Sequence, residues 1–431
     1  MSKVIHKIEK ILYLPHIRVS ESRWEDFIVN EKSLEVLKKY DLNIQRVGRG
    51  RGGMILSTDE GMRLFLECSH PDGFYFKEDS VTAVLGLSGF TDTDIYIRNE
   101  DGEIITEDVD GRKYIVKKWF DAKECDVRNI DELCNTVTRL AVLHKHFNVI
   151  SDTDMLTIYR RNHMQNVYKN KVEDAVVNVV KAAQVCVDDG EEFELKENKN
   201  VPSIENDKKN DKENDIENDK KNDKENIKRD DREVHKKSTI KADYERHMKE
   251  LKLTTNYLKN KRNRSEFEQL AYKNISAFRQ EAQDAVEMMS SDNLVKRFAD
   301  VENKGELVHG SYNYHNVLFG NGLTAVTNFD RCKNECQISD LYQFMRKILE
   351  KYNWNIELAY KLIDEYDKIK PIADDDLELL SALFSFPEKF WKIINHYFNN
   401  NKAWIPQKNY DKLSKVIEQN KYRRQFIAQL H

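Results

Sequence analysis

The fold is decided by two stretches in the C-terminal half of the chain, HGSYNYHNVLF at residues 309–319 and VTNFD at residues 326–330. The first is a polar loop that runs into an apolar, strand-like segment, and the second ends in a short polar group. An apolar stripe with helical spacing follows at residues 338–352 and is wide enough to face a protein core. Loop, strand, polar group and helix in this order predict that the two polar groups lie together at neighbouring strand ends.

The N-terminal part predicts a small antiparallel sheet. Short apolar runs within residues 41–120 are broken by glycine-containing turns at residues 59–61, 101–102 and 110–111. Such turns suit tight hairpins because glycine tolerates a positive φ. We therefore expect a strand-rich first lobe.

Helical spacing begins after Trp119 and resumes near Tyr244, and His144 on the first apolar helix face is expected to be a satisfied core histidine. Between these regions ENDKKNDKEN occurs twice, at residues 205–214 and 217–226, in a tandem repeat without aromatic side chains. This repeat cannot bury enough apolar surface to offset its ordering entropy, so we expect a disordered insertion. The predicted organisation is a strand-rich N-lobe with a glycine loop at 1–118, a hinge with the first C-lobe helices at 119–187, the charged insertion at 188–238 and a helical C-lobe at 239–431.

The glycine-rich run GRGRGG at residues 48–53 satisfies the pattern G-x-G-x-x-G. It lies between two expected strands rather than between a strand and a helix, which favours a flap over nucleotide phosphates above a dinucleotide site. Gly48, Gly50 and Gly53 are therefore candidate nucleotide contacts. An ordinary glycine-rich hairpin explains the same residues equally well.

Composition argues against several classes of protein. The 431 residues include 70 basic and 75 acidic side chains, a net charge of −5, so the chain lacks the global positive field that binds nucleic acid or anionic membranes. No run approaches the roughly 18 apolar residues of a membrane span, and the N-terminal residues lack a signal-peptide core. We expect no nucleic-acid partner, no membrane span and a product that stays in the cell. The six scattered cysteines predict reduced thiols.

The loop at residues 309–319 resembles the H-G-D-x-x-x-x-N motif of aminoglycoside and choline kinase-like phosphotransferases, and more closely resembles the CotS family of bacterial endospore coat proteins. The resemblance also includes STDEG before MRLFLE, KKWFDAKEC, LAVLHKH and FPEKFWKIINHYFNNNKAWIP, and it extends over nearly the whole chain except the charged insertion. It implies an α+β, bilobal, protein-kinase-like fold with a small antiparallel β N-lobe and a large, mainly α-helical C-lobe.

Several positions agree with the family pattern. The resemblance places His309 and Gly310 at the start of the catalytic loop and Asn316 at the second metal-ligand position. Asp330 corresponds to the last acid of a D-F-D triplet, and Asp340 to the acid that opens the next helix. We expect His309 and Asn316 to remain as structural hydrogen-bonding residues, and the two acids to accept from backbone N–H groups or cap a helix.

Three positions depart from the family pattern. Ser311 stands at the general base, Asn328 at the principal magnesium aspartate and Glu67 at the strand-three lysine. A serine cannot accept a proton at neutral pH, and an amide oxygen is a weaker magnesium ligand than a carboxylate. Glu67 would add negative charge beside a triphosphate, and no lysine occurs between Lys39 and Lys77 to replace the missing cation. We therefore expect a cleft stripped of the cation and the carboxylates that phosphoryl transfer needs.

The sequence thus predicts a pseudokinase with no cofactor and no metal. The family resemblance implies a structural or assembly role in the endospore coat, with other spore coat proteins as partners. It also implies a location in the cytoplasm of the sporulating mother cell and then in the coat. Two alternatives stay open: an atypical phosphotransferase of the aminoglycoside and choline kinase-like superfamily that uses ATP and magnesium, or a pseudokinase that still binds a nucleotide.

Overall fold

The computed structural model describes residues 35–50, 52–152, 240–320, 322–399 and 406–430, together with residues 156, 157, 159 and 160. The charged insertion expected at residues 188–238 lies outside these described residues. The chain divides into two units, one formed by residues 1–153 with 236–431 and the other by residues 154–235. All the elements described below belong to the first unit.

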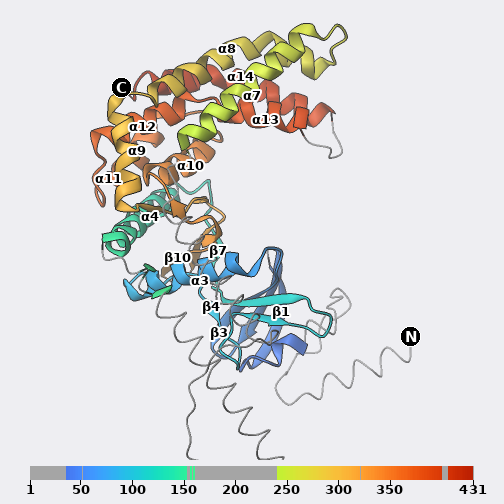
Figure 1. The fold of residues 1–431 in the computed structure, drawn as a ribbon, viewed down its shortest axis with the longest axis vertical. Coiled ribbons are helices and arrows are strands. Elements are labelled where there is room, and N and C mark those ends of the chain that lie inside the picture. Colours follow the sequence, from blue (N-terminus) through green and yellow to red (C-terminus); the bar gives the residue numbers. More distant parts are fainter. Residues whose placement is uncertain are drawn as a thin grey trace, which may run out of the picture. The chain divides into compact units, whose positions relative to one another are not determined.

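The N-terminal lobe is built on an antiparallel sheet, which carries the labels β1, β3 and β4 in Figure 1. The strand order of this sheet is β1-β2-β3-β6-β4. A further short strand, β5, pairs with the N-terminal part of β6. The small strand-rich lobe expected from the sequence is therefore confirmed. The strands are β1 (Ile44–Gly50), β2 (Gly53–Thr58), β3 (Gly61–Glu67), β4 (Tyr96–Ile97), β5 (Ile105–Glu107) and β6 (Lys113–Lys118).

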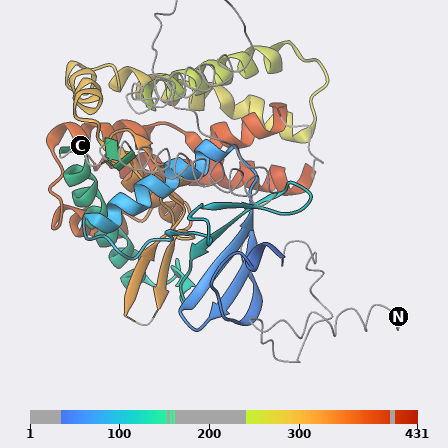
Figure 2. The same ribbon diagram turned by 60° about the horizontal axis from the view of Figure 1, so that its bottom comes forward.

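The two faces of this sheet are covered by different parts of the chain. One face, which includes Phe65 and Val116, packs against apolar side chains that precede β1. The other face is covered by helix α3 (Asp72–Leu87), drawn in blue in Figure 2. Tyr75 of this helix packs against Tyr96 and Ile115. Because side chains alternate between the faces of a strand, each position on β3 and β6 is committed to one of these two environments.

Helix α3 is an element that the sequence reading did not predict. Proline at its N-cap and Asp72 in its first turn favour a helix start at this place. Its buried side, however, carries polar residues that include Glu78, Asp79 and Thr82. The apolar periodicity that reveals a helix is therefore weak here, and the buried acids have a role in the site described below.

The C-terminal lobe is mainly helical, as expected. Three small strand pairings interrupt it and lie around the predicted site: β7 (Lys123–Glu124) with β9 (Val317–Gly320), β9 with β10 (Leu323–Val326), and β8 (Leu307–Val308) with β11 (Lys333–Asn334). Among the helices of the described ranges, none is both long and apolar enough to cross a membrane. The helices are α4 (Ile130–Asp152), α7 (Ile240–Asn260), α8 (Glu266–Met288), α9 (Asp292–Lys304), α10 (Ile338–Leu349), α11 (Ile356–Asp367), α12 (Asp374–Ser385), α13 (Glu388–Asn399) and α14 (Pro406–Ile427).

Helix α4 lies in the core of the C-terminal lobe and contacts α3, α10, α11 and β8. The apolar face predicted from its sequence spacing is confirmed, because Leu133, Val137, Leu140 and His144 are all completely buried. Residues four positions apart lie on the same side of a helix, so one continuous side of α4 faces the core. The neighbours of α4 include β8 and α10, which flank the predicted site.

Glu388, at the start of α13, is the acid of a largely buried ionic cluster in the helical lobe. Its carboxylate accepts a hydrogen bond from the hydroxyl of Tyr342 at 2.7 Å, lies 3.3 Å from Nε of Arg346 and pairs with Lys392. Burial opposes ionisation of Glu388, but the charges of Arg346 and Lys392 outweigh it and lower the pKa of this carboxyl to about 2. The ionised carboxylate therefore stabilises the fold.

The pH dependence of stability should reveal this carboxylate. A pKa lowered from 4.5 to about 2 contributes stability that is present above pH 4.5 and is lost as the pH falls through 2. In Glu388→Gln this contribution is absent, so the difference in unfolding free energy between wild type and variant should shrink by about 3 kcal/mol between roughly pH 5 and pH 2. Urea unfolding followed by circular dichroism measures it.

The matched control is Glu357→Gln, which changes an exposed glutamate in the first turn of α11. This variant should stay within about 0.5 kcal/mol of wild type at each pH. A wild type and Glu388→Gln pair that differ by a constant amount over the whole pH range would contradict the role assigned to Glu388.

Candidate functional site

The predicted catalytic loop, residues 309–316, connects β8 to β9 and is held by a carboxylate at the start of α10. Asp340 accepts hydrogen bonds from the backbone N–H groups of His309 at 2.6 Å and Gly310 at 2.9 Å. Gly310 has a φ of 77°, and a Cβ there would lie 2.1 Å from the carbonyl oxygen of Arg331. Only glycine fits this close approach. The expectation that Asp340 accepts from backbone N–H groups is confirmed.

Asp340 is itself anchored in the core through His144. The imidazole Nε2 of His144 lies 3.2 Å from Oδ2 of Asp340, and its Nδ1 lies 2.6 Å from the hydroxyl of Tyr366. Burial lowers the pKa of His144, so a neutral ring with its proton on Nε2 fits both contacts. The structure thus confirms His144 as a satisfied core histidine.

His309 ties the loop to the second predicted segment. Its Nε2 lies 3.1 Å from the carbonyl oxygen of Thr327, and its Nδ1 accepts a hydrogen bond from the backbone N–H of Ser311 at 3.3 Å. The ring is completely buried, and burial lowers its pKa. His309 therefore has the structural role expected of it.

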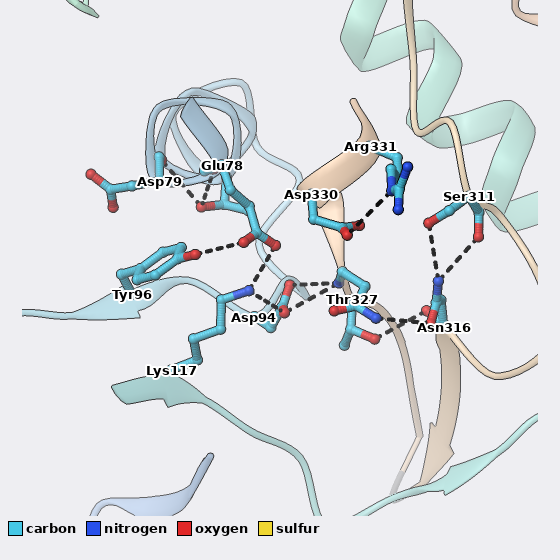
Figure 3. A network of polar contacts seen from close by, with 12 residues as sticks. Glu78, Asp79, Asp94, Tyr96, Lys117, Ser311, Asn316, Thr327, Asp330 and Arg331 are labelled. Carbon is cyan, nitrogen blue, oxygen red and sulfur yellow. Dashed lines mark hydrogen bonds and ion pairs between the residues drawn. The ribbon is translucent and has the colours of Figure 1, made fainter. Parts of the chain in front are cut away.

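Three polar side chains at the predicted base and metal positions hydrogen-bond to one another. Nδ2 of Asn316 donates to the carbonyl oxygen of Ser311 at 3.0 Å and to its hydroxyl at 3.3 Å (Figure 3). Nδ2 of Asn328 in turn donates to Oδ1 of Asn316 at 3.3 Å. The structure thus brings Ser311, Asn316 and Asn328 together, as the sequence predicted, and these three side chains are neutral.

Asp330 contributes the carboxylate that the family pattern places at the end of the second segment. It lies 3.7 Å from Nε of the exposed Arg331. Burial and the charge of Glu78 raise the pKa of Asp330. Contrary to the expectation, no backbone N–H of the described residues donates to it within hydrogen-bond distance. In the same ranges no group of three or more His, Cys, Asp or Glu side chains is arranged to hold a metal ion.

Beside these residues lies a buried ionic cluster that the sequence reading missed, the Lys117 triad of Lys117, Glu78 and Asp94 (Figure 3). Nζ of Lys117, on β6, lies 2.7 Å from Oε1 of Glu78 on α3 and 2.8 Å from Oδ2 of Asp94. Both carboxylate oxygens of Asp94 accept from the backbone N–H of Asn328 at 3.2 Å. The residues of the triad are only 1% to 4% exposed.

Burial and pairing compete in the Lys117 triad. Burial disfavours the ammonium of Lys117, but the carboxylates of Asp94 and Glu78 outweigh it and hold its pKa above the usual value. Burial raises the pKa of Asp94 to about 6 against the attraction of Lys117. The hydroxyl of Tyr96 donates to Oε2 of Glu78 at 2.5 Å, which satisfies the second oxygen of that carboxylate.

The expectation of a cleft without a cation or carboxylates is therefore wrong. No lysine occurs between Lys39 and Lys77, the part of the sequence that includes the expected third strand. The lysine comes instead from β6, which is the neighbour of β3 in the sheet. A lysine within the apolar run KYIVKK was the signal that could have revealed it, because a buried charge needs a partner.

Glu67 does not join this cluster. It is the exposed last residue of β3 and pairs with Tyr114, whereas Lys117 pairs with Leu64. Paired residues share a face, and Tyr114 and Lys117 are three positions apart, so Glu67 and Lys117 lie on opposite faces of the sheet. The expectation that Glu67 places a negative charge beside a phosphate is therefore wrong.

The glycines of the glycine-rich run lie where two strands meet, as predicted: Gly48 and Gly50 are in β1, and Gly53 begins β2 and pairs with Gly50. A Cβ at Gly53 would lie 2.3 Å from the carbonyl oxygen of Phe65, and one at Gly50 would lie 2.7 Å from Cγ1 of Ile55. Both glycines are therefore required by close packing within the sheet. Gly48 has only an ordinary contact, at 3.9 Å. The nucleotide contact stays a prediction for all three.

No family model and no curated protein matches the sequence. Solved structures match the fold. A crystal structure of an aminoglycoside phosphotransferase from Alicyclobacillus acidocaldarius aligns with a TM-score of 0.65 at 14% identity, covering 95% of this chain and 97% of that one. The spectinomycin phosphotransferase APH(9)-Ia, in complex with ADP and spectinomycin, gives 0.52 at 11% identity, covering 92% and 98%. The chain therefore has the bilobal kinase-like fold of aminoglycoside phosphotransferases, as expected.

Removing the anchor of the loop should destabilise the protein strongly. Asp340→Ala leaves the backbone N–H of the buried His309 and that of the partly buried Gly310 without their acceptor, and each such loss costs about 1–3 kcal/mol. We expect the free energy of unfolding to fall by about 3 kcal/mol in urea titrations. Asp330→Ala is the matched control, because the carboxylate of Asp330 is partly exposed and its ionised form is disfavoured by burial and by the charge of Glu78. An Asp340→Ala protein as stable as Asp330→Ala would contradict the anchoring role.

Proposed function

We propose that this protein is a catalytically degenerate member of its fold class, which does not transfer phosphate and serves as a structural or assembly component of the bacterial endospore coat. The observation that carries the proposal is the chain of neutral hydrogen bonds from Ser311 through Asn316 to Asn328. In the family pattern, Ser311 stands at the position of the general base and Asn328 at that of the principal magnesium aspartate.

The chemistry of phosphoryl transfer supports this conclusion. The reaction depends on positioning and on cancelling the charge of the triphosphate with metal ions and a lysine. Ser311 cannot act as a general base at neutral pH, and such a base is worth roughly 10²–10⁴-fold in rate. The amide of Asn328 donates to the amide oxygen of Asn316, and neither amide brings a negative charge to a hard cation. Asp330 alone supplies a carboxylate at the expected positions.

The coat role rests on the resemblance to the CotS family. That resemblance extends over both lobes, from STDEG in the first to FPEKFWKIINHYF in the last helices. A role in assembly fits a chain that retains the scaffold around Asp340 while its base and metal positions are neutral. The corresponding partners are other spore coat proteins, and the location is the mother-cell cytoplasm followed by the coat.

A second candidate function is an atypical phosphotransferase or a nucleotide-binding pseudokinase. The observation that favours it is the ion pair of 2.7 Å between Lys117 and Glu78. Kinases use such a lysine, held by a glutamate on the helix of the N-terminal lobe, to contact the α- and β-phosphates. Here the lysine is supplied by a different strand, β6, and under this second candidate Asp330 would be the carboxylate available to magnesium.

Phosphoryl transfer can be tested directly. We expect the purified full-length chain, incubated with ATP and magnesium, to release no more ADP than the variant Asn316→Ala, because both proteins have Ser311 at the base position and Asn328 at the position of the principal magnesium aspartate. The protein should also be detected by antibody in coat extracts of spores of the bacterium that encodes it. Turnover that disappears in Asn316→Ala, or a protein absent from the coat, would overturn the corresponding half of the proposal.

Nucleotide binding needs a separate measurement. A ligand present at 100 times its dissociation constant stabilises the folded state by about 2.7 kcal/mol, which raises the melting temperature by several degrees. We expect no such shift for wild type with millimolar ATP, with or without magnesium. A shift without turnover would favour the nucleotide-binding pseudokinase, and a shift that requires magnesium would favour the atypical enzyme.

A further inference from the structure

The carboxylate of Asp94 is bound by an ammonium group and a backbone N–H, a donor set that binds free anions in other proteins. Its Oδ2 lies 2.8 Å from Nζ of Lys117, and both of its oxygens accept from the backbone N–H of Asn328 at 3.2 Å. An ammonium group together with a backbone N–H is the usual donor set of a phosphate or carboxylate site. Asp94 is 1% exposed, so these donors are closed to solvent.

The orientation of Lys117 strengthens this comparison. On one side Nζ is held by Oε1 of Glu78 at 2.7 Å, and the other oxygen of Glu78 accepts from Tyr96 at 2.5 Å. In a phosphotransferase the lysine that pairs with the helix glutamate directs its remaining charge to the nucleotide phosphates. In this chain the remaining charge of Lys117 is directed to the carboxylate of Asp94 (Figure 3).

Backbone contacts of the two residues before Asp94 with β10 of the second lobe hold Asp94 in this position. The preceding residue, Thr93, forms a parallel bridge with Val326 at the end of β10, and the carbonyl oxygen of Asp92 accepts from the N–H of Val326 at 2.9 Å. The carboxylate is therefore tethered next to its donors, so a free anion must compete with an intramolecular group of high effective concentration.

We propose that Asp94 is an internal anion that fills a phosphate-binding site formed by the ammonium of Lys117 and the backbone N–H of Asn328, so that phosphate groups can bind there only when this carboxylate is removed. The inference rests on the proposed function, because it gives a physical reason for the lack of nucleotide binding that the proposed function expects. It goes further by naming the site, its donors and the group that blocks it.

The charges around the site set the strength of binding after Asp94 is removed. Glu78 remains paired with Lys117, Asp330 lies nearby, and the exposed Arg331 is 3.7 Å from Asp330. A phosphate would gain one ammonium and one N–H donor but would face two carboxylates. We therefore expect binding in the millimolar range rather than at nucleotide-kinase affinity.

The test uses Asp94→Ala in the full-length protein, with inorganic phosphate as the probe and chloride of equal ionic strength as the reference. Wild type should show no phosphate-specific rise in melting temperature. Asp94→Ala should melt several degrees lower than wild type and should be restored in part by phosphate and by formate. Its apparent dissociation constant for phosphate should be at least about tenfold lower than that of wild type.

Two further variants provide the controls. Asp92→Ala removes a carboxylate two residues away that pairs with Arg139 at 3.2 Å and does not touch Lys117. It should gain no response to phosphate. The double variant Asp94→Ala with Lys117→Met should lose the response, because the ammonium is the main donor. Asp94→Ser is a second variant of the site, to be used if Asp94→Ala does not fold. The serine hydroxyl can still accept a hydrogen bond from the N–H of Asn328, but it carries no negative charge.

Each outcome decides the question. No phosphate response in either Asp94 variant, rescue by formate but not by phosphate, or a wild type that responds as strongly as the variants would overturn the internal-anion proposal. A response that survives Lys117→Met would also overturn it. The proposed function fails separately, through ATP turnover by wild type. The two proposals can therefore be rejected independently.

Discussion

The buried lysine of β6 is the constraint on which the site depends. An ammonium group in a protein interior is stable only when ion pairs and hydrogen bonds replace its hydration, and removing one partner of such a group is strongly destabilising. Lys117 is paired with Glu78 and Asp94, and Asp94 is bonded in turn to the backbone of Asn328. One charge therefore connects the sheet, α3 and the second polar segment of the site.

A second buried group, Asp340, fixes the shape of the loop at residues 309–316. Its carboxylate is used entirely for the backbone N–H groups of His309 and Gly310 and for His144. None of these contacts involves the residue at the base position, Ser311. The anchoring of the loop by Asp340 is therefore physically separate from the hydrogen bonds among Ser311, Asn316 and Asn328.

Local patterns predicted those parts of the fold that depend on local physics. The buried face of α4 and the glycine hairpin followed from spacing, because a helix face and a tight turn are set by neighbouring residues. Helix α3 escaped notice because it buries acids such as Glu78 instead of an apolar stripe. Glu67 was placed at the site because alignment cannot detect the strand register, and a slip of one residue moves a side chain to the other face.

The sequence by itself determined the order of loop, strand and helix and the kinase-like fold class, and it identified Ser311 and Asn328 as polar residues of the two segments, since residue identities need no coordinates. Only the tertiary structure decided which charges occupy the site. Lys117 meets Glu78 across 39 residues, and Asp94 meets Asn328 across 234. Contacts over such separations are set by strand register and lobe packing, which no local pattern of side chains encodes.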